Sequence, residues 1–451
     1  MSWMRIANCL AWIVIPLVAG PPQRSYTVEN YDVHIQPDLA KQRLNGEVSI
    51  RFHTLADTPI SALEVDAGGL QIASVVEGEN AQYFERKGSL LTVVLTNPLH
   101  PDEHRTITVR YQAGPAPGLK FFPDQIYTSG TSDWMPCNDR PGERATLHLA
   151  ITVPPDAKVA ASGQLTSTRT SEGQSVTEWQ LDSATEPSWF GFALGGFSEN
   201  TSEAEGLKLR ALGAGAQVLE PTAAAMRFVG ERSGKRFPGQ TYTQVFIHGD
   251  VIRSMASGLT LLPESYAQGL EKPDTLWLLS SELARQWYGL GIPSKDWSDL
   301  WLSEGISAFL ADAFLGERLG KEAFEREIEH SRQIYNRLRA QGKDRSLAFS
   351  GWTTRQEADG EIPAHKGVCF LYLVRELVGD SAFWQGLRAY TGDFWGQVVT
   401  SEDFQKAFGA TSWGNRDAGK KSDAAARKKG PKALDNLFDL WVYGIPAGKA
   451  K

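Results

Sequence analysis

Cysteine is scarce in this sequence. Only Cys9, Cys137 and Cys369 occur among 451 residues, and their wide spacing matches none of the paired arrangements that bind a structural metal ion. A small secreted domain that is stabilised by disulfide bonds needs many more cysteines. We therefore expect neither a disulfide framework nor a cysteine-based metal site.

The sequence also has few positively charged residues relative to negatively charged ones. The 46 Lys and Arg residues are outnumbered by 53 Asp and Glu residues, and the formal net charge is -7. Nucleic-acid binding requires a clustered basic surface, so we expect no nucleic-acid partner. Residues 416–432 are biased toward basic side chains, with seven basic against two acidic residues. Such a bias is typical of a solvated, flexible insertion.

Long hydrophobic runs are missing, apart from one short run at the N-terminus. It extends from Ile6 to Ala19, follows a single cation at Arg5 and is interrupted by Pro16. The segment resembles a secretory signal peptide and is too short for a clear membrane span. We expect residues 1–20 to be this signal, and the protein to be secreted or periplasmic. Pro21 follows the best cleavage point directly, so one alternative is that the segment stays uncleaved and anchors the protein to a membrane. A second alternative is that the segment forms the first strand of the fold.

Two kinds of periodicity divide the rest of the chain. From Tyr26 to Phe197 apolar residues recur at every second position, which indicates half-buried antiparallel strands. We expect a β domain over residues 21–198, a polar linker over residues 199–206 and a mainly helical domain over residues 207–451. Helical length and spacing predict helices at Pro221–Arg236, Thr275–Gly289, Ile306–Leu319, Glu322–Gln341 and Val368–Val378.

The stretch Leu276–Gly305 carries the pattern with the most chemistry. A helix here places apolar residues on one face and groups Ser281, Glu282 and Arg285 on the other. A zinc metallopeptidase has the same layout in H-E-x-x-H, with two histidine ligands at i and i+4 and a glutamate base. The histidine positions read Ser281 and Arg285, and Glu304 follows 23 positions after the first of them.

This spacing resembles that of the zinc aminopeptidase family of aminopeptidase N, whose third zinc ligand is a glutamate in W-L-N-E-G. Nearly the whole chain after the signal shares the likeness, in the segments Trp134–Pro141, Pro187–Phe197, Gln286–Gly289, Trp301–Gly305 and Phe438–Pro446. The resemblance implies a saddle-like antiparallel β domain followed by a mainly helical, thermolysin-like catalytic domain. It also implies that the family's C-terminal helical-repeat domain is absent, because the sequence stops soon after Pro446.

The resemblance implies roles that this sequence retains only in part. Glu282 has the position of the general base and Glu304 that of the third ligand. Ser281 and Arg285 replace both histidine ligands, and neither substitutes for them, because a hydroxyl is a poor ligand and a guanidinium has no lone pair to give. We expect no bound metal at these degenerate positions and an idle Glu282.

Two substrate-binding elements of the family are degenerate as well. The segment that matches the amine-binding G-x-M-E-N strand contains Met255, Ala256, Ser257 and Gly258, with Ala256 at the position of the amine-binding glutamate. The oxyanion-stabilising tyrosine is replaced by Ala364, next to His365.

A physical reason for Arg285 follows from the two retained carboxylates. Without a metal ion, Glu282 and Glu304 would repel each other in one cavity, and an arginine between them could bridge both. Each pair would be worth about 4 kcal/mol of Coulomb energy at an effective dielectric constant near 20, before desolvation is subtracted.

The leading interpretation is therefore an inactive member of this family that needs no cofactor and binds a peptide or protein. The alternative is an active zinc aminopeptidase with a rearranged site, in which His365 or His248 joins Glu304 as a ligand. A serine nucleophile at Ser281 is disfavoured, because no nucleophile-elbow motif surrounds it and the neighbouring Arg285 stays protonated.

Overall fold

The computed structural model describes residues 24–101, 103–140, 142–256, 258–268, 272–352, 355–414 and 424–444. The predicted signal or anchor in residues 1–20 lies outside this part of the chain, so its nature stays a prediction. None of the described helices is long and apolar enough to span a membrane.

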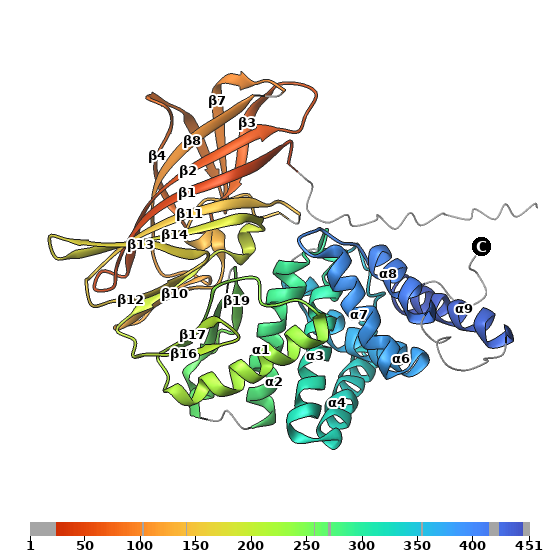
Figure 1. The fold of residues 1–451 in the computed structure, drawn as a ribbon. Coiled ribbons are helices and arrows are strands. Elements are labelled where there is room, and N and C mark those ends of the chain that lie inside the picture. Colours follow the sequence, from red (N-terminus) through yellow and green to blue (C-terminus); the bar gives the residue numbers. More distant parts are fainter. Residues whose placement is uncertain are drawn as a thin grey trace, which may run out of the picture.

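An eight-stranded sheet dominates the N-terminal unit, as Figure 1 shows. Its strands lie in the order β13-β14-β11-β1-β2-β8-β4-β5, and all neighbouring pairs are antiparallel except β1 with β11. The bounds are β1 Tyr26–Asp38, β2 Arg43–Thr54, β4 Gln71–Glu77, β5 Asn80–Ala81, β8 His104–Ala113, β11 Ala145–Val153, β13 Gln164–Ser171 and β14 Gln174–Thr185. The alternation that predicted this β domain is confirmed: Tyr31, Val33 and Ile35 of β1 are buried, and polar residues between them face outward.

Two smaller sheets complete this unit. One has the order β3-β7-β6 and packs its apolar side against the large sheet; its bounds are β3 Ile60–Asp66, β6 Tyr83–Lys87 and β7 Leu90–Leu99. The other has the order β12-β15-β10-β9, with β9 Leu119–Phe121, β10 Gln125–Thr128, β12 Lys158–Ala161 and β15 Phe192–Gly195. Cys137 in this unit and Cys369 in the next are both buried free thiols.

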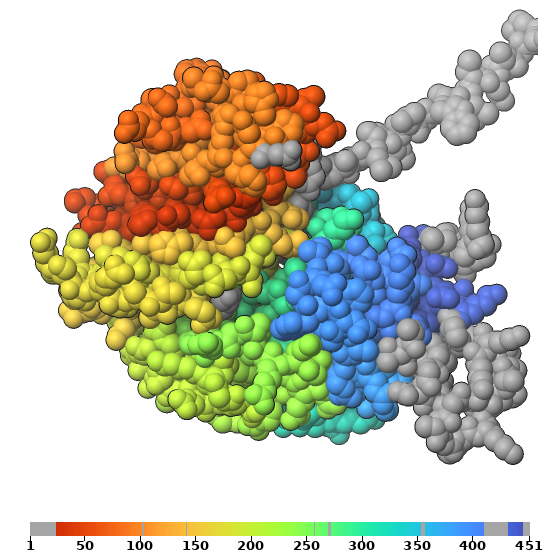
Figure 2. Space-filling view, turned by 45° about the horizontal axis from the view of Figure 1, so that its top comes forward, coloured from red at the N-terminus to blue at the C-terminus, as the bar shows by residue number. Residues whose placement is uncertain are grey.

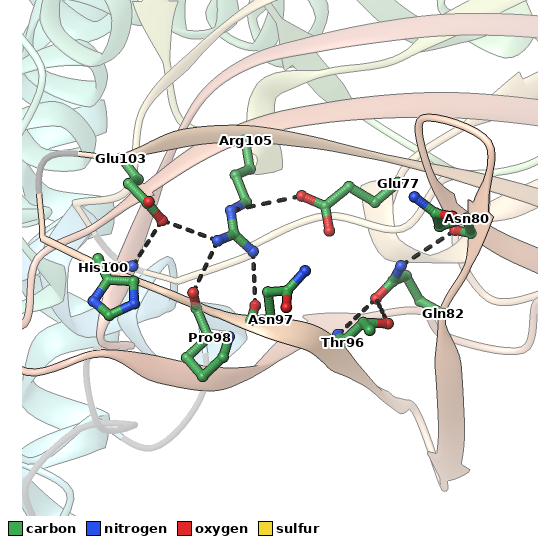
Figure 3. Close-up of polar contacts among 9 residues, drawn as sticks. All are labelled: Glu77, Asn80, Gln82, Thr96, Asn97, Pro98, His100, Glu103 and Arg105. Carbon is green, nitrogen blue, oxygen red and sulfur yellow. Dashed lines mark hydrogen bonds and ion pairs between the residues drawn. The ribbon is translucent and has the colours of Figure 1, made fainter.

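One arginine organises the connection from β7 to β8 (Figure 3). The Arg105 guanidinium donates to the carbonyls of Asn97 and Pro98 at 2.7 and 2.8 Å and to the carboxylate of Glu103 at 2.9 Å. These contacts provide donors to carbonyls near the end of β7, in the stretch where its register with β3 shifts.

The second unit begins with a five-stranded sheet of order β16-β17-β18-β20-β19. Its bounds are β16 Glu199–Ala204, β17 Leu207–Leu212, β18 Thr241–Ile247, β19 Arg253–Met255 and β20 Leu259–Pro263. The predicted linker at 199–206 is therefore wrong, because β16 pairs with β17 through a tight hairpin. Glu205 and Gly206 form its turn with φ of 55° and 77°. An edge strand with alternating exposure contains enough polar residues to resemble a linker.

Helix α1 connects β17 to β18, the other helices follow the sheet in sequence, and the helices lie beside the sheet in Figure 1. Their bounds are α1 Leu219–Ser233, α2 Pro273–Arg285, α3 Trp301–Leu319, α4 Lys321–Ala340, α5 Arg355–Ala358, α6 Gly367–Val378, α7 Asp380–Phe394, α8 Ser401–Gly414 and α9 Ala424–Trp441. The five predicted helices are present with shifted ends, whereas the sequence predicts none of α5, α7, α8 and α9. Residues 424–432 of the predicted flexible insertion belong to α9, where a run of alanines favours a helix, and residues 416–423 lie outside the described part.

The two units share a buried apolar cluster. Tyr127, Ala160 and Ala193 of the β12-β15-β10-β9 sheet form one buried cluster with Val245 and Met255 of the five-stranded sheet. Figure 2 shows the result, with the red-to-yellow β domain seated on the green and blue second unit. A shared core fixes the orientation of the units, and thereby that of any site between them.

Helix α3 is the centre of the second unit, because it packs against α2 on one side and against the start of α6 on another. The closest approach involves two glycines. A Cβ atom added to Gly305 would lie 3.0 Å from Gly367 Cα and 3.2 Å from the carbonyl oxygen of Pro363. Both neighbours are backbone atoms, which cannot move aside as a flexible side chain does.

Gly305→Ala is therefore expected to destabilise the protein by about 1–3 kcal/mol, through overpacking between α3 and α6. Urea denaturation followed by circular dichroism measures the change. Gly392→Ala is the matched control, since Gly392 is an exposed glycine in α7 with open space around its Cβ position. The control variant is expected to be neutral or stabilised by up to about 1 kcal/mol. Equal effects at both positions would contradict this description of the helix contact.

Candidate functional site

Helix α2 supplies the first part of the site. It starts at Pro273, whose fixed φ suits the first helical position, and its Leu276, Leu279 and Leu283 are buried as predicted. The polar side of the helix is buried too, because Ser281 and Glu282 are each only 2% exposed and face the neighbouring helix layer. After Arg285 the chain winds into a π-helical turn, Gln286–Gly291, and such turns are frequent at functional sites.

Arg285 connects the two retained carboxylates. Its Nη1 donates to Glu282 Oε1 at 2.5 Å within α2, and its Nη2 donates to Glu304 Oε2 in the first turn of α3. The two glutamate side chains are 3% and 5% exposed, against 25% for Arg285. The predicted bridge is confirmed, and it joins two helices through one planar cation.

The surroundings keep Arg285 charged. Burial alone would lower the pKa of its guanidinium, but the carboxylates of Glu282, Glu304 and Asp359 more than offset this effect and raise the pKa above its ordinary value. Asp359, in the connection between α5 and α6, is a third acidic neighbour that the sequence analysis missed. Its position 55 residues beyond Glu304 carries no periodic signal that would have revealed it.

A hydroxyl group donates a hydrogen bond to the other carboxylate oxygen of Glu282. Ser254 Oγ, on β19, lies 2.8 Å from Glu282 Oε2 and 2.8 Å from the Glu282 carbonyl oxygen, so its proton is shared between two acceptors. Arg285 and Ser254 thus engage both oxygens of the carboxylate at the general-base position. The sequence analysis gave Ser254 no role, because the contact depends on how β19 packs against α2.

A zinc ion does not fit this set of side chains. A catalytic zinc site has three protein donors with lone pairs, whereas Glu304 is the one ligand position that retains a suitable donor. Ser281 is buried and has only a hydroxyl to offer, and the permanent cation of Arg285 lies between the carboxylates, where a divalent ion would meet like charge.

The degenerate amine-binding segment is fixed by backbone contacts. Met255 and Ala256 are fully buried, and Ala256 N donates to the Trp189 carbonyl of the β domain at 2.9 Å. Gln286 accepts from Gly258 N at 2.9 Å and donates to the Met255 carbonyl at 3.1 Å. Ser257 lies outside the described residues. This segment therefore serves as packing between the β domain and the end of α2.

The two histidines that might have replaced the zinc ligands have other partners. His365 and Ala364 lie in a π-helical turn, Ile362–Lys366, where His365 Nδ1 is 3.0 Å from Ser331 Oγ. Burial, with a smaller effect of His330, lowers the pKa of His365 to about 4. His248 contacts Glu264 at 3.0 Å and Asp124 at 3.2 Å. Within the described ranges, neither imidazole forms a group of three metal donors with Glu304.

Arg285→Ala would leave the buried carboxylates without their cation, so we expect a loss of about 3–5 kcal/mol in the free energy of unfolding. Arg332→Ala is the matched control, because Arg332 contacts Glu329 at the same i,i+3 spacing on α4 but in a well-exposed pair. That variant should change stability by less than about 0.5 kcal/mol. Urea denaturation of both variants provides the comparison. An Arg285→Ala protein as stable as the wild type would show that the bridge contributes nothing.

Comparison with known proteins agrees with this architecture. The model of the peptidase M1 N-terminal domain matches residues 27–186, and that of the peptidase family M1 domain matches residues 254–441. Aminopeptidase B of Rattus norvegicus is 21% identical over 428 residues, which cover 82% of this chain and 62% of that protein. Leucine aminopeptidase 2 of Aspergillus clavatus is 23% identical, with 95% of this chain and 74% of the relative covered.

The fold is shared with solved structures as well. The crystal structure of an M1 zinc metallopeptidase from Deinococcus radiodurans superposes with a TM-score of 0.73 at 22% identity, covering 94% of this chain and 95% of that one. A variant of the same metallopeptidase bound to a Tyr-Ser-Ala substrate gives a TM-score of 0.71. This chain spans less than two thirds of the rat relative, and at these identities the structural likeness concerns the fold. With a β domain, a helical domain and two family models that match in this order, the chain belongs to peptidase family M1.

Proposed function

We propose that this chain is a non-catalytic member of peptidase family M1 that binds an extended polypeptide segment. The observation that carries the proposal is the Arg285 guanidinium, which is bound to Glu282 and Glu304 and belongs to the second of the two histidine positions that the family resemblance implies. Peptide hydrolysis by this class depends on a metal-bound water and a glutamate base. A fixed cation cannot activate water in this way, because it offers no coordination site.

The buried bridge has a structural purpose that does not require catalysis. It neutralises the carboxylates that the site retains, and it ties α2 to α3 at the centre of the second unit. Loss of Arg285 would therefore damage the fold, which gives a reason to keep these residues in a protein that does not cleave peptides.

A cavity between the two units supports binding of an extended segment. Its volume is about 540 Å³, which is within the range of ligand sites, and it lies at a domain interface, where such sites are frequent. Residues of β12, the last strand in its sheet, line one side. A strand at the end of a sheet can pair with an added peptide strand through main-chain hydrogen bonds.

The charges of this cavity favour an acidic segment. Lys158, Lys208 and Arg210 line it together with Glu199. Glu199 accepts from Lys158 and from Arg210, whereas Lys208 is exposed to solvent. With three basic side chains against one acidic, a carboxylate-bearing peptide gains attraction that a basic peptide does not.

The test of inactivity is an aminopeptidase assay of the whole chain with alanyl and leucyl chromogenic substrates in the presence of added zinc. We expect no turnover above that of a Glu282→Gln variant, because the wild-type site cannot form a metal-bound hydroxide. The variant also controls for contaminating peptidases, since these would act equally in both preparations. Wild-type turnover that Glu282→Gln abolishes would refute the proposal and favour the rearranged zinc site.

The test of binding uses fluorescently labelled peptides of extended conformation, with acidic and basic members of equal length. We expect the acidic peptides to bind more tightly, and Lys208→Glu to weaken them at least tenfold by placing like charge in the cavity. Lys87→Glu, at an exposed position on β6, is the control for net charge and should leave the affinity unchanged. Equal affinities for wild type and Lys208→Glu would exclude this cavity as the binding site. Competition for the labelled peptide distinguishes two occupants. Displacement by an unlabelled acidic peptide indicates that a free peptide binds, whereas displacement by a folded acidic protein indicates a strand of a partner.

A further inference from the structure

The outer face of the eight-stranded sheet has an unusual concentration of imidazoles. Four of the eight histidines in the chain lie there, in two pairs that each share one carboxylate. One group consists of Glu29, His53 and His104, and the other of Asp32, His34 and His148. In both groups the three donor atoms lie within 4.8 Å of one another. Neither group is related to the α2–α3 site of the second unit.

The Asp32 group is built by the register of two strands. β1 and β11 are parallel neighbours in the middle of the sheet, and Asp32 pairs directly with His148. His34 follows Asp32 by two residues and therefore emerges on the same face. Asp32 Oδ1 lies 2.7 Å from His148 Nδ1 and 3.3 Å from His34 Nε2.

We propose that Asp32, His34 and His148 bind a divalent transition-metal ion of the zinc type. Two imidazole nitrogens and one carboxylate oxygen are the donors that zinc prefers, and three protein ligands leave a fourth position for water or another ligand. Tetrahedral bonds of zinc place donor atoms about 3.3 Å apart. Of the two distances from Asp32 Oδ1, the one to His34 already matches this value and the one to His148 must widen by roughly 0.6 Å. The two imidazole nitrogens lie within 4.8 Å of each other. Each imidazole coordinates a metal ion through the lone pair of one ring nitrogen, and in the bound state it carries its proton on the other ring nitrogen.

Electrostatics distinguishes this group from the other. Glu29 offers Oε1 to His53 and His104, but its Oε2 is held by Arg51 Nε at 2.8 Å, and that cation would repel a metal ion. Among the described residues, the ion-pair partners of Asp32 are the two imidazoles alone. The Asp32 group is therefore the one in which a divalent ion meets no competing guanidinium.

Rigidity and access favour the same group. All three side chains project from two central strands, which hold donors more closely in place than loops do. Their exposed fractions are 46% for Asp32, 59% for His34 and 29% for His148, so an ion can enter from solvent without any rearrangement of the core.

Titration of the full chain with Zn²⁺, after removal of metal with a chelator and in competition with a chromophoric zinc indicator, tests this proposal. We expect one tight equivalent in the wild type, weakened at least tenfold by His34→Ala and by His148→Ala. His100→Ala removes an exposed histidine outside both groups and should leave the affinity unchanged. Cobalt(II) in place of zinc should show the visible absorption of a tetrahedral site in the wild type and lose it in His148→Ala.

Four outcomes would overturn the proposal. Three of them are no tight zinc equivalent in the wild type, full retention of that equivalent in both sheet variants, and its selective loss in His53→Ala, which would assign the ion to the Glu29 group. Loss of the equivalent in Glu304→Gln would instead place zinc between α2 and α3, and would refute the proposed absence of catalysis as well. Zinc content alone therefore does not reveal whether the family's catalytic site is occupied.

Discussion

The cation of Arg285 is the constraint on which the centre of the second unit depends. Two buried carboxylates face each other across α2 and α3, and a third, Asp359, is near enough to act on the same guanidinium. Buried charges of one sign are tolerated only when opposite charge and hydrogen bonds compensate them. In a zinc peptidase the metal ion provides this compensation, whereas here a side chain provides it without offering a coordination site.

The remaining structure around this bridge is arranged for packing. Gly305 lets α3 approach the start of α6, while Ala256 and Trp189 join the β domain to the edge of the five-stranded sheet. These features belong to the two-unit architecture that the chain shares with peptidase family M1.

Much of the fold was predictable from the sequence, because it follows from local periodicity. Alternating residues such as those of β1 revealed the β domain, and spacing along α2 revealed its buried stripe. The failures have a common cause. The β16 edge strand is polar on its exposed side and was read as a linker, and α7 contains Gly386, Thr391 and Gly392, which weaken a helical signal. In both cases tertiary contacts stabilise an element that its own residues specify poorly.

The sequence by itself determined which chemical groups occupy the ligand positions. It therefore settled that Ser281 and Arg285 are four positions apart on one helix, and that Arg285 lies within reach of Glu282 about one helical turn away. Only the tertiary structure decided that Ser254 and Asp359 join this site, and that His148 meets Asp32 across 116 positions of sequence. Contacts within a helix follow from its period, whereas contacts between distant strands depend on register and packing, which no local pattern encodes.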